Sequence, residues 1–179
     1  MDQIIDKYLE KLIAIGLNKL PSKIVTEMAD PNQDKDEEWR VWNPIISRVT
    51  NDEIEEFELK LGHKLPESYK KFLKYKHFYN LQISECSFCE HPAGIWRESL
   101  IEIIFDGYPR NFLIDTGRIP FANWSDWGLL CFDTTSEHTN NDYPIVLWDY
   151  EISYEFEPKY SNFDTMIIEL DKEEKENVI

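Results

Sequence analysis

The hydrophobic pattern of this chain changes period near residue 100, and that change limits the folds it can adopt. Before residue 100, apolar residues recur every three or four positions, as on one face of a helix. After it, short β-rich runs are separated by Gly, Pro and Asn-Asn. We therefore predict an α+β fold: N-terminal helices, a mainly antiparallel sheet of about six strands and a C-terminal helix.

Local signals at helix ends place the expected helices. Thr50-Asn51-Asp52-Glu53 has the spacing of a capping box, in which Thr50 and Glu53 satisfy each other's backbone N–H groups. Gly62 is well placed as a left-handed C-cap. The sequence predicts an amphipathic helix ending near Gly16, a second helix between Thr50 and Gly62, a third from Pro66 and a last one from Phe163.

The β-rich part supplies six candidate strands and a polar hairpin loop from Thr134 to Pro144. Phe121, Phe132 and Trp148 alternate as inward-facing residues would, so we assign them to the core. The candidate strands are Leu100–Phe105, Phe112–Ile114, Ile119–Ala122, Leu129–Asp133, Ile145–Tyr150 and Ser153–Glu157.

The overall charge narrows the class of partner. The formal net charge at pH 7 is −16 over 179 residues. Nucleic acids and anionic membranes are bound through clustered Lys and Arg, so we expect neither as a partner. A charge of this sign favours fast association with a cationic protein.

Targeting signals and cysteine usage indicate the compartment. Residues 1–7 lack the basic start and apolar run of a signal peptide. No apolar run approaches the roughly 20 residues that span a bilayer. The chain has three cysteines, and a number that is both low and odd does not indicate a disulfide framework. We expect a cytoplasmic protein.

Between Arg118 and Lys159 the sequence contains no lysine or arginine. These 40 residues carry eight acids interleaved with tryptophans and tyrosines. A field of one sign steers a partner of opposite charge, and aromatic side chains anchor protein contacts. The alternative is that the aromatics are core and the acids only solvate the outer face. The turn and loop residues that we predict to bind a partner are Trp124, Asp126, Trp127, Glu137, Asp142, Asp149, Tyr150 and Glu151.

Several segments, taken in order, resemble the SMI1/KNR4 family, also called the SUKH superfamily. The resemblance covers roughly residues 40–170 and divides the chain into an N-terminal helix with an acidic linker (1–38) and a single SMI1/KNR4-like domain (39–176). The segments that carry it are Trp42-Asn43-Pro44-Ile45, Thr50-Asn51-Asp52-Glu53-Ile54, Leu61-Gly62, Leu65-Pro66-Glu67-Ser68-Tyr69, Ile119-Pro120-Phe121-Ala122, Gly128-Leu129-Leu130-Cys131-Phe132-Asp133 and Pro144-Ile145-Val146-Leu147-Trp148.

This resemblance implies a compact α+β fold without a catalytic centre. Many bacterial members of the family are immunity proteins for polymorphic toxins, often nucleases, whereas fungal members regulate cell-wall synthesis. The resemblance therefore implies an antitoxin that binds a cognate toxin protein stoichiometrically, and the net charge of −16 indicates that this toxin is basic. The alternative is a regulatory or scaffold module that binds an endogenous protein. Neither reading requires an enzyme activity or a cofactor, and the sequence leaves the oligomeric state open.

One cysteine pair is the candidate for metal chemistry. Cys86, Cys89 and His91 could supply three ligands to Zn²⁺, with Cys131, His77 or His138 as the fourth. The sequence has no second Cys-x-x-Cys, and no thioredoxin-like pattern surrounds this one. Ordinary thiols in a connecting loop are the default expectation, and no cofactor is predicted.

The sequence gives little support for catalysis. Asp115-Thr116-Gly117 resembles the active-site turn of a retropepsin-type protease, but Arg118 follows where such enzymes have a small residue. We predict a strand end and a turn with Gly117 at positive φ. The chain also lacks Gly-x-Ser-x-Gly and a phosphate-binding glycine loop.

Overall fold

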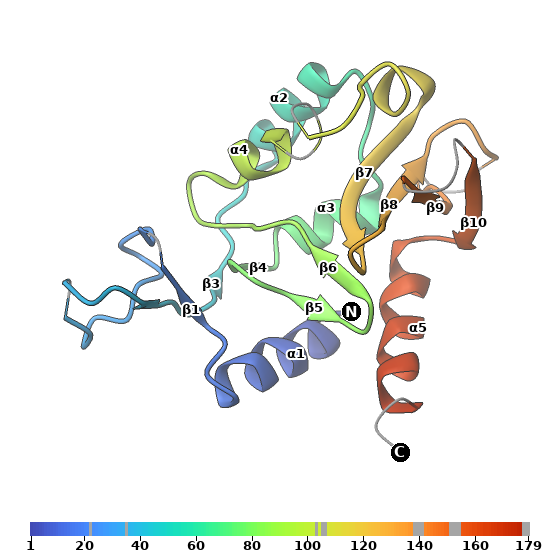
Figure 1. Cartoon of the computed structure of the whole chain (residues 1–179). Helices are drawn as coiled ribbons and strands as arrows, with labels where there is room; N and C mark the ends of the chain where they lie inside the picture. The colour runs from blue at the N-terminus through green and yellow to red at the C-terminus, as the bar shows by residue number, and fades with distance from the viewer. Residues whose placement is uncertain are drawn as a thin grey trace.

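The computed structural model describes residues 1–21, 23–34, 36–102, 104, 107–137, 142–150 and 155–176. In this part, the chain has the predicted α+β fold, with helices arranged around a six-stranded antiparallel sheet (Figure 1). The elements in chain order are α1 (Asp2–Ala14), β1 (Lys19–Leu20), β2 (Arg40–Val41), β3 (Ile45–Ile46), α2 (Asn51–Leu61), α3 (Glu67–Leu73), β4 (Lys76–His77), β5 (Gln82–Ile83), β6 (Cys86–Phe88), α4 (Trp96–Ile101), the 3₁₀ helix η2 (Ile114–Thr116), β7 (Arg118–Trp124), β8 (Gly128–Asp133), β9 (Ile145–Asp149), β10 (Phe156–Tyr160) and α5 (Phe163–Glu176).

The main sheet is a meander in which neighbouring strands follow one another along the chain. Its order is β10-β9-β8-β7-β6-β5, and every pair is antiparallel. Two short pairs, β1-β2 and β3-β4, lie outside it. Local connections of this kind bring most of the 40-residue stretch without Lys or Arg together in the neighbouring strands β7, β8, β9 and β10.

One face of the sheet, here called the inner face, packs against helices. Phe121 and Phe132 point to this side, and their rings stack with centroids 4.0 Å apart. Tyr69 of α3 and Phe163 of α5 close over them, and all four side chains are buried. The prediction that Phe121 and Phe132 are core residues is confirmed.

The other face, here called the outer face, carries a second, smaller apolar cluster. Leu129, Cys131, Val146 and Trp148 form its buried part, and the segment between α4 and β7 covers it through Leu113. Trp148 is 5% exposed, so its predicted burial is confirmed. It lies, however, on the face opposite to Phe121 and Phe132, because β9 residues alternate between the two clusters.

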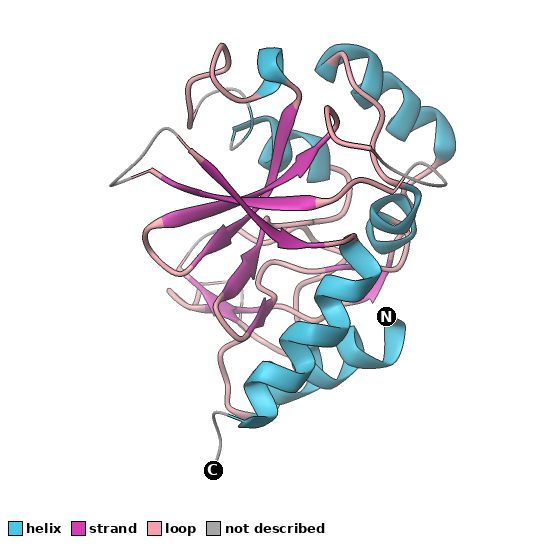
Figure 2. Ribbon diagram, turned by 90° about the vertical axis from the view of Figure 1, so that its right-hand side faces the viewer, coloured by secondary structure: helices cyan, strands magenta, loops and turns pink. Residues whose placement is uncertain are grey.

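The predicted helix ends agree closely with the structure. Thr50 and Glu53 form both hydrogen bonds of the capping box, and Gly62 ends α2 with φ of 83°. Pro66 precedes the first residue of α3 rather than being that residue. Helices α1 and α5 lie side by side (Figure 2), joined by a 2.6 Å ion pair between Lys7 Nζ and Asp171 Oδ1.

Some strand predictions were wrong. Residues 100–101 belong to α4, where Trp96 and Leu100 lie one turn apart and are both buried. Packing of that helical stripe overrides the β-branched pattern that suggested Leu100–Phe105, of which residues 103, 105 and 106 lie outside the described part. In the predicted strand Phe112–Ile114, the first two residues lie in a turn and Ile114 begins η2.

The β10 prediction was partly right, and β6 was missed. Strand β10 runs from Phe156 to Tyr160, and residues 151–154 lie outside the described part. Cys86–Phe88 forms β6, where we had expected a loop. None of the described helices combines the length and the apolar composition needed to cross a membrane.

Candidate partner-binding surface

The turn between β7 and β8 brings four of the predicted binding residues together. Ser125 has a positive φ of 52°, which turns the chain sharply after β7, and Gly128 pairs with Asp149 across the ladder. The Tyr150 hydroxyl donates a 2.5 Å hydrogen bond to the Asp126 carbonyl oxygen. The four residues, here called the turn group, are Asp126, Trp127, Asp149 and Tyr150.

Trp124 does not belong to this surface, which corrects the prediction that it lies in an exposed turn. It is the last residue of β7, is 7% exposed and packs against Tyr160. The register of β7 against β8 shifts between Pro120 and Ala122. That irregularity places both Phe121 and Ala122 on the inner side, so the alternation that follows turns Trp124 inward.

Trp127 and Tyr150 differ in exposure. Trp127 is half-buried and packs against the main core, whereas Tyr150 is 37% exposed. Asp126 is exposed and Asp149 is half-buried. The turn group therefore presents one aromatic ring and one carboxylate prominently, with a second ring anchored in the fold.

Glu137 and Asp142 lie at the opposite end of β8 and β9. Together with Thr134, Thr135, Ser136 and Asn162 they line a hollow of about 740 Å³. Glu137 is exposed. Asp142 Oδ1 accepts hydrogen bonds from the Ser68 backbone N–H and hydroxyl, at 3.1 and 2.6 Å, and so caps the start of α3. Glu137 and Asp142 are here called the loop group; Glu151 lies outside the described residues.

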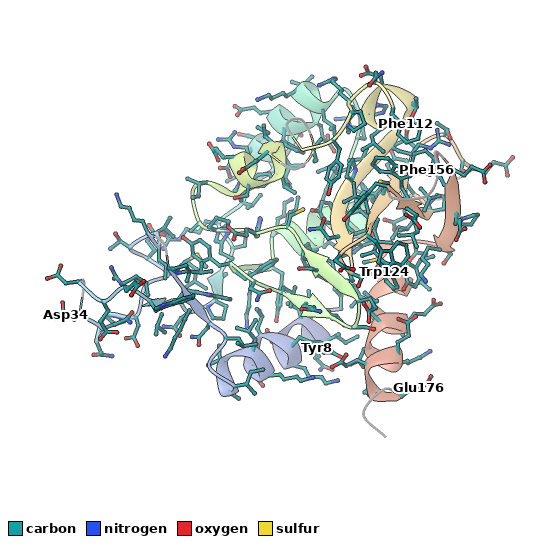
Figure 3. All side chains as sticks on the ribbon, viewed as in Figure 1. Tyr8, Asp34, Phe112, Trp124, Phe156 and Glu176 are labelled. Carbon is teal, nitrogen blue, oxygen red and sulfur yellow. The ribbon has the colours of Figure 1, made fainter. Side chains whose placement is uncertain are left out.

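An aromatic cluster on the outer face adjoins the turn group. Phe112 lies 5.1 Å from Trp148 and 5.3 Å from Phe156, measured between ring centroids. Tyr108 and Tyr150 lie 6.0 Å from Trp148 and 5.9 Å from each other. These five residues are here called the outer aromatic patch; Figure 3 labels Phe112 and Phe156 within it and Trp124 away from it.

Tyr108, Phe112 and Phe156 were missed as candidate binding residues. Each is half-buried, so each ring packs on Trp148 while part of it remains open to solvent. Tyr108 and Phe112 precede the acidic stretch in the sequence, and they come to lie over β9 only when the strands have assembled into the sheet. The alternation of side chains along β9 could have indicated the patch, because Val146, Trp148 and Tyr150 share one face.

At the edge of the outer aromatic patch, the positive charge of Arg118 lies beside the negative charge of Asp133. Its guanidinium Nε lies 3.5 Å from Asp133 Oδ1, and the guanidinium carbon lies 5.2 Å from the centre of the Phe156 ring. The pKa of Asp133 is lowered: burial acts to raise it, but hydrogen bonds from Ser136 and Thr135 and the charge of Arg118 outweigh that effect. Asp133 is therefore a structural carboxylate held by its own loop.

The side chains of Cys86, Cys89 and His91 are buried and take part in packing, whereas His138 lies outside the described residues. Cys89 Sγ donates to the Phe121 carbonyl oxygen at 3.0 Å, and His91 Nε2 lies 2.7 Å from the Leu73 carbonyl oxygen. Burial raises the pKa of Cys86 well above its usual value and that of Cys89 to about 12, so both remain thiols. Within the described ranges, no three His, Cys, Asp or Glu side chains are placed to hold a metal ion, Cys86, Cys89 and His91 included.

The protease-like turn follows a 3₁₀ helix instead of the predicted strand end, but its glycine has the predicted positive φ. Asp115 lies in η2 and pairs with Arg110 at 3.1 Å. Gly117 has φ of 83°, as predicted. A Cβ on Gly117 would come within 2.6 Å of Thr134 Oγ1, so this position also needs glycine for space.

Comparison with known proteins identifies one family. The sequence model of the SMI1 / KNR4 family (SUKH-1) matches residues 48–169. A search of curated proteins found no match. The matched range runs from the loop between β3 and α2 into α5, so it includes the main sheet, the turn group, the loop group and the outer aromatic patch.

Proposed function

This chain belongs to the SMI1/KNR4 family (SUKH-1), and from that premise we propose that it is an immunity protein that binds a cognate toxin and neutralises it stoichiometrically. The proposal includes a cytoplasmic location, a basic toxin (a nuclease in the simplest case) and no enzymatic activity of its own. It is supported most directly by one observation. The 40-residue stretch without Lys or Arg folds into adjacent strands, which brings Asp126, Asp149 and Tyr150 together at one end of β8 and β9.

The proposed contact is centred on the turn group and the outer aromatic patch. Tyr150 belongs to both, because its hydroxyl binds the Asp126 carbonyl while its ring packs near Trp148 and Tyr108. An anchored ring of this kind loses little conformational entropy on binding. Trp127, Asp149 and Glu151 remain part of the proposal, whereas Trp124 is buried on the inner side and is left out of it.

Charge would act at a longer range than the aromatic contacts. A nuclease active site is a cationic groove, and a chain of net charge −16 attracts such a surface before contact. Asp126, Glu137 and Asp142 contribute to this field. Asp142 also caps α3, so its substitution would mix a folding effect with a binding effect and is a poor test.

Co-expression tests the proposal. The toxin domain encoded beside this gene would be expressed with and without the protein, and host survival and co-purification would be scored. Rescue together with a one-to-one complex is the expected result. Host death without a complex, with a toxin shown to be active, would instead favour a regulatory module with an endogenous partner.

Single variants locate the contact. Tyr150→Ala should accelerate dissociation by more than about 30-fold, as expected for an aromatic anchor. Asp126→Lys should slow association about threefold or more and flatten its dependence on salt. Glu55→Lys is the matched control, because Glu55 is also exposed but lies on α2. Equal effects of Asp126→Lys and Glu55→Lys would mean that only net charge matters.

A further inference from the structure

A groove between α1 and β5 combines exposed apolar side chains with an edge strand of the sheet. It has a volume of about 230 Å³ and is lined by Tyr8 and Leu12 on α1, Ile15 and Leu17 just after it, and Asn80, Gln82 and Ser84 around β5. Ile15 is 62% exposed and Leu17 is 58% exposed. Ile15 and Leu17 together place exposed apolar surface beside the hollow, and clustered apolar surface is a mark of interaction sites.

The two edges of the sheet differ in protection. Strand β10 forms one edge and carries Glu157, Pro158 and Lys159, all exposed, with a register irregularity at Pro158. Charge, proline and bulges are the usual means of preventing edge-to-edge contact. Strand β5 forms the other edge, and the segment from Phe78 to Ser84 contains no charged residue and no proline.

Backbone geometry directs Gln82 toward the groove. The Phe88 N–H donates to the Leu81 carbonyl oxygen at 3.0 Å, so residue 81 points toward β6. Gln82 is paired with Ser87, one residue along, and its own N–H and C=O therefore point away from β6. The open edge thus faces the side of the molecule on which Ile15 and Leu17 are exposed.

The charges of the groove suit a second copy of the same chain. A second copy also carries a net charge of −16, so self-association requires a face on which charge is locally balanced. The two charged side chains that line this groove, Lys11 and Glu174, form an ion pair with 2.7 Å between Nζ and Oε1. One cation and one anion at the rim are self-complementary across a two-fold axis, as an isologous contact requires.

We propose that this groove is a homodimer interface in which Ile15 and Leu17 of each copy enter the groove of the other. The interface lies away from the outer aromatic patch: Figure 3 labels Tyr8 on α1 and Glu176 at the end of α5, far from Phe112 and Phe156. A dimer formed in this way leaves both proposed toxin-binding surfaces accessible. The proposal does not rest on the immunity function.

Analytical ultracentrifugation of the full chain tests the interface. Wild type should show a reversible dimer at concentrations up to about 100 µM, and Ile15→Glu and Leu17→Glu should each weaken dimerisation by more than about 30-fold, since each change occurs twice per dimer. Leu59→Glu is the matched control: Leu59 is 82% exposed on α2, and the substitution adds the same charge. Circular dichroism would verify that all variants remain folded.

Salt dependence separates this contact from toxin capture. Dimerisation of two chains of charge −16 should strengthen as salt screens their repulsion, whereas association with a cationic toxin should slow. A wild type that remains monomeric at about 100 µM in high salt overturns the proposal. So does a Leu59→Glu variant that dissociates as readily as Ile15→Glu.

Discussion

The two faces of the main sheet use the same strands for different purposes. On the inner face, Phe121 and Phe132 stack under helices and are 1% and 0% exposed. On the outer face, Trp148 is buried, but Phe112 and Phe156 are only half-buried and Tyr150 is 37% exposed. The residues of β8 and β9 that point inward therefore complete a core, while the alternate residues, which point outward, build a partly open aromatic surface bordered by acids.

This contrast indicates why an acidic, aromatic sequence can fold stably and still retain a binding surface. The inner cluster joins α1, α3, α5 and the sheet in one core. Among the described residues, the outer cluster joins β8, β9, β10 and the segment before β7. Substitutions on the inner face should therefore act on stability, and those on the open part of the outer face should act mainly on binding.

The largest expected effect is on the inner face. Phe132→Ala should lower the free energy of unfolding by about 3–5 kcal/mol, because it leaves a cavity among rings that cannot collapse into it. Phe112→Ala should cost about 1–2 kcal/mol, since part of that ring is already in water. Urea denaturation of both variants measures the difference. Equal losses would mean that the outer cluster is as much a core as the inner one.

Gly117→Ala tests the turn that joins η2 to β7. Its φ of 83° and the 2.6 Å approach to Thr134 Oγ1 should together cost about 2–3 kcal/mol. Gly62→Ala is the control: Gly62 has the same φ of 83°, but nothing lies within 4 Å of an added Cβ. That variant should lose only about 1 kcal/mol. Thermal or urea unfolding compares the two, and a Gly62→Ala loss as large as that of Gly117→Ala would contradict the steric argument.

Acid should weaken the fold through the buried histidines at positions 77 and 91, whose rings stack with centroids 4.8 Å apart. Burial, and then the neighbouring His77, lower the pKa of His91 to about 3. The unfolded chain binds a proton near pH 6.5, whereas the folded chain does not. The contribution of neutral His91 to the stability of the fold is therefore complete above pH 6.5 and is lost as pH falls toward 3.

The difference in the pKa of His91 between the folded and the unfolded chain predicts a loss of about 1–2 kcal/mol in unfolding free energy between pH 7 and pH 5. Urea denaturation at the two pH values measures it. His91→Gln should be less stable at pH 7 but should lose less stability on acidification than wild type. An unchanged pH slope in that variant would assign the loss to other groups.

The smallest effect on stability is expected for the exposed acids. Asp126→Lys and Glu137→Lys should each change the unfolding free energy by less than about 0.5 kcal/mol, because both side chains are exposed. Their effect should appear in the rate of toxin association instead. Paired denaturation and stopped-flow measurements would reveal whether stability and binding separate as the two faces suggest.

Much of the helical structure was predictable because its signals are local. Thr50 and Glu53 lie three residues apart, and Gly62 marks the end of the same helix. The placement of Trp124 was not predictable, because it depends on a register shift between β7 and β8. The same applies to the outer aromatic patch, in which Phe112 meets Phe156 only after the whole sheet has formed.

Hydrogen exchange of the protein alone and in complex with its toxin domain tests the central claim most directly. We expect binding to protect residues 124–128 and 145–150, which hold the turn group and part of the outer aromatic patch, while α1 and β5 exchange as before. Protection confined to α1 and β5, or to α2 and α4, would contradict the assignment of toxin capture to the outer face.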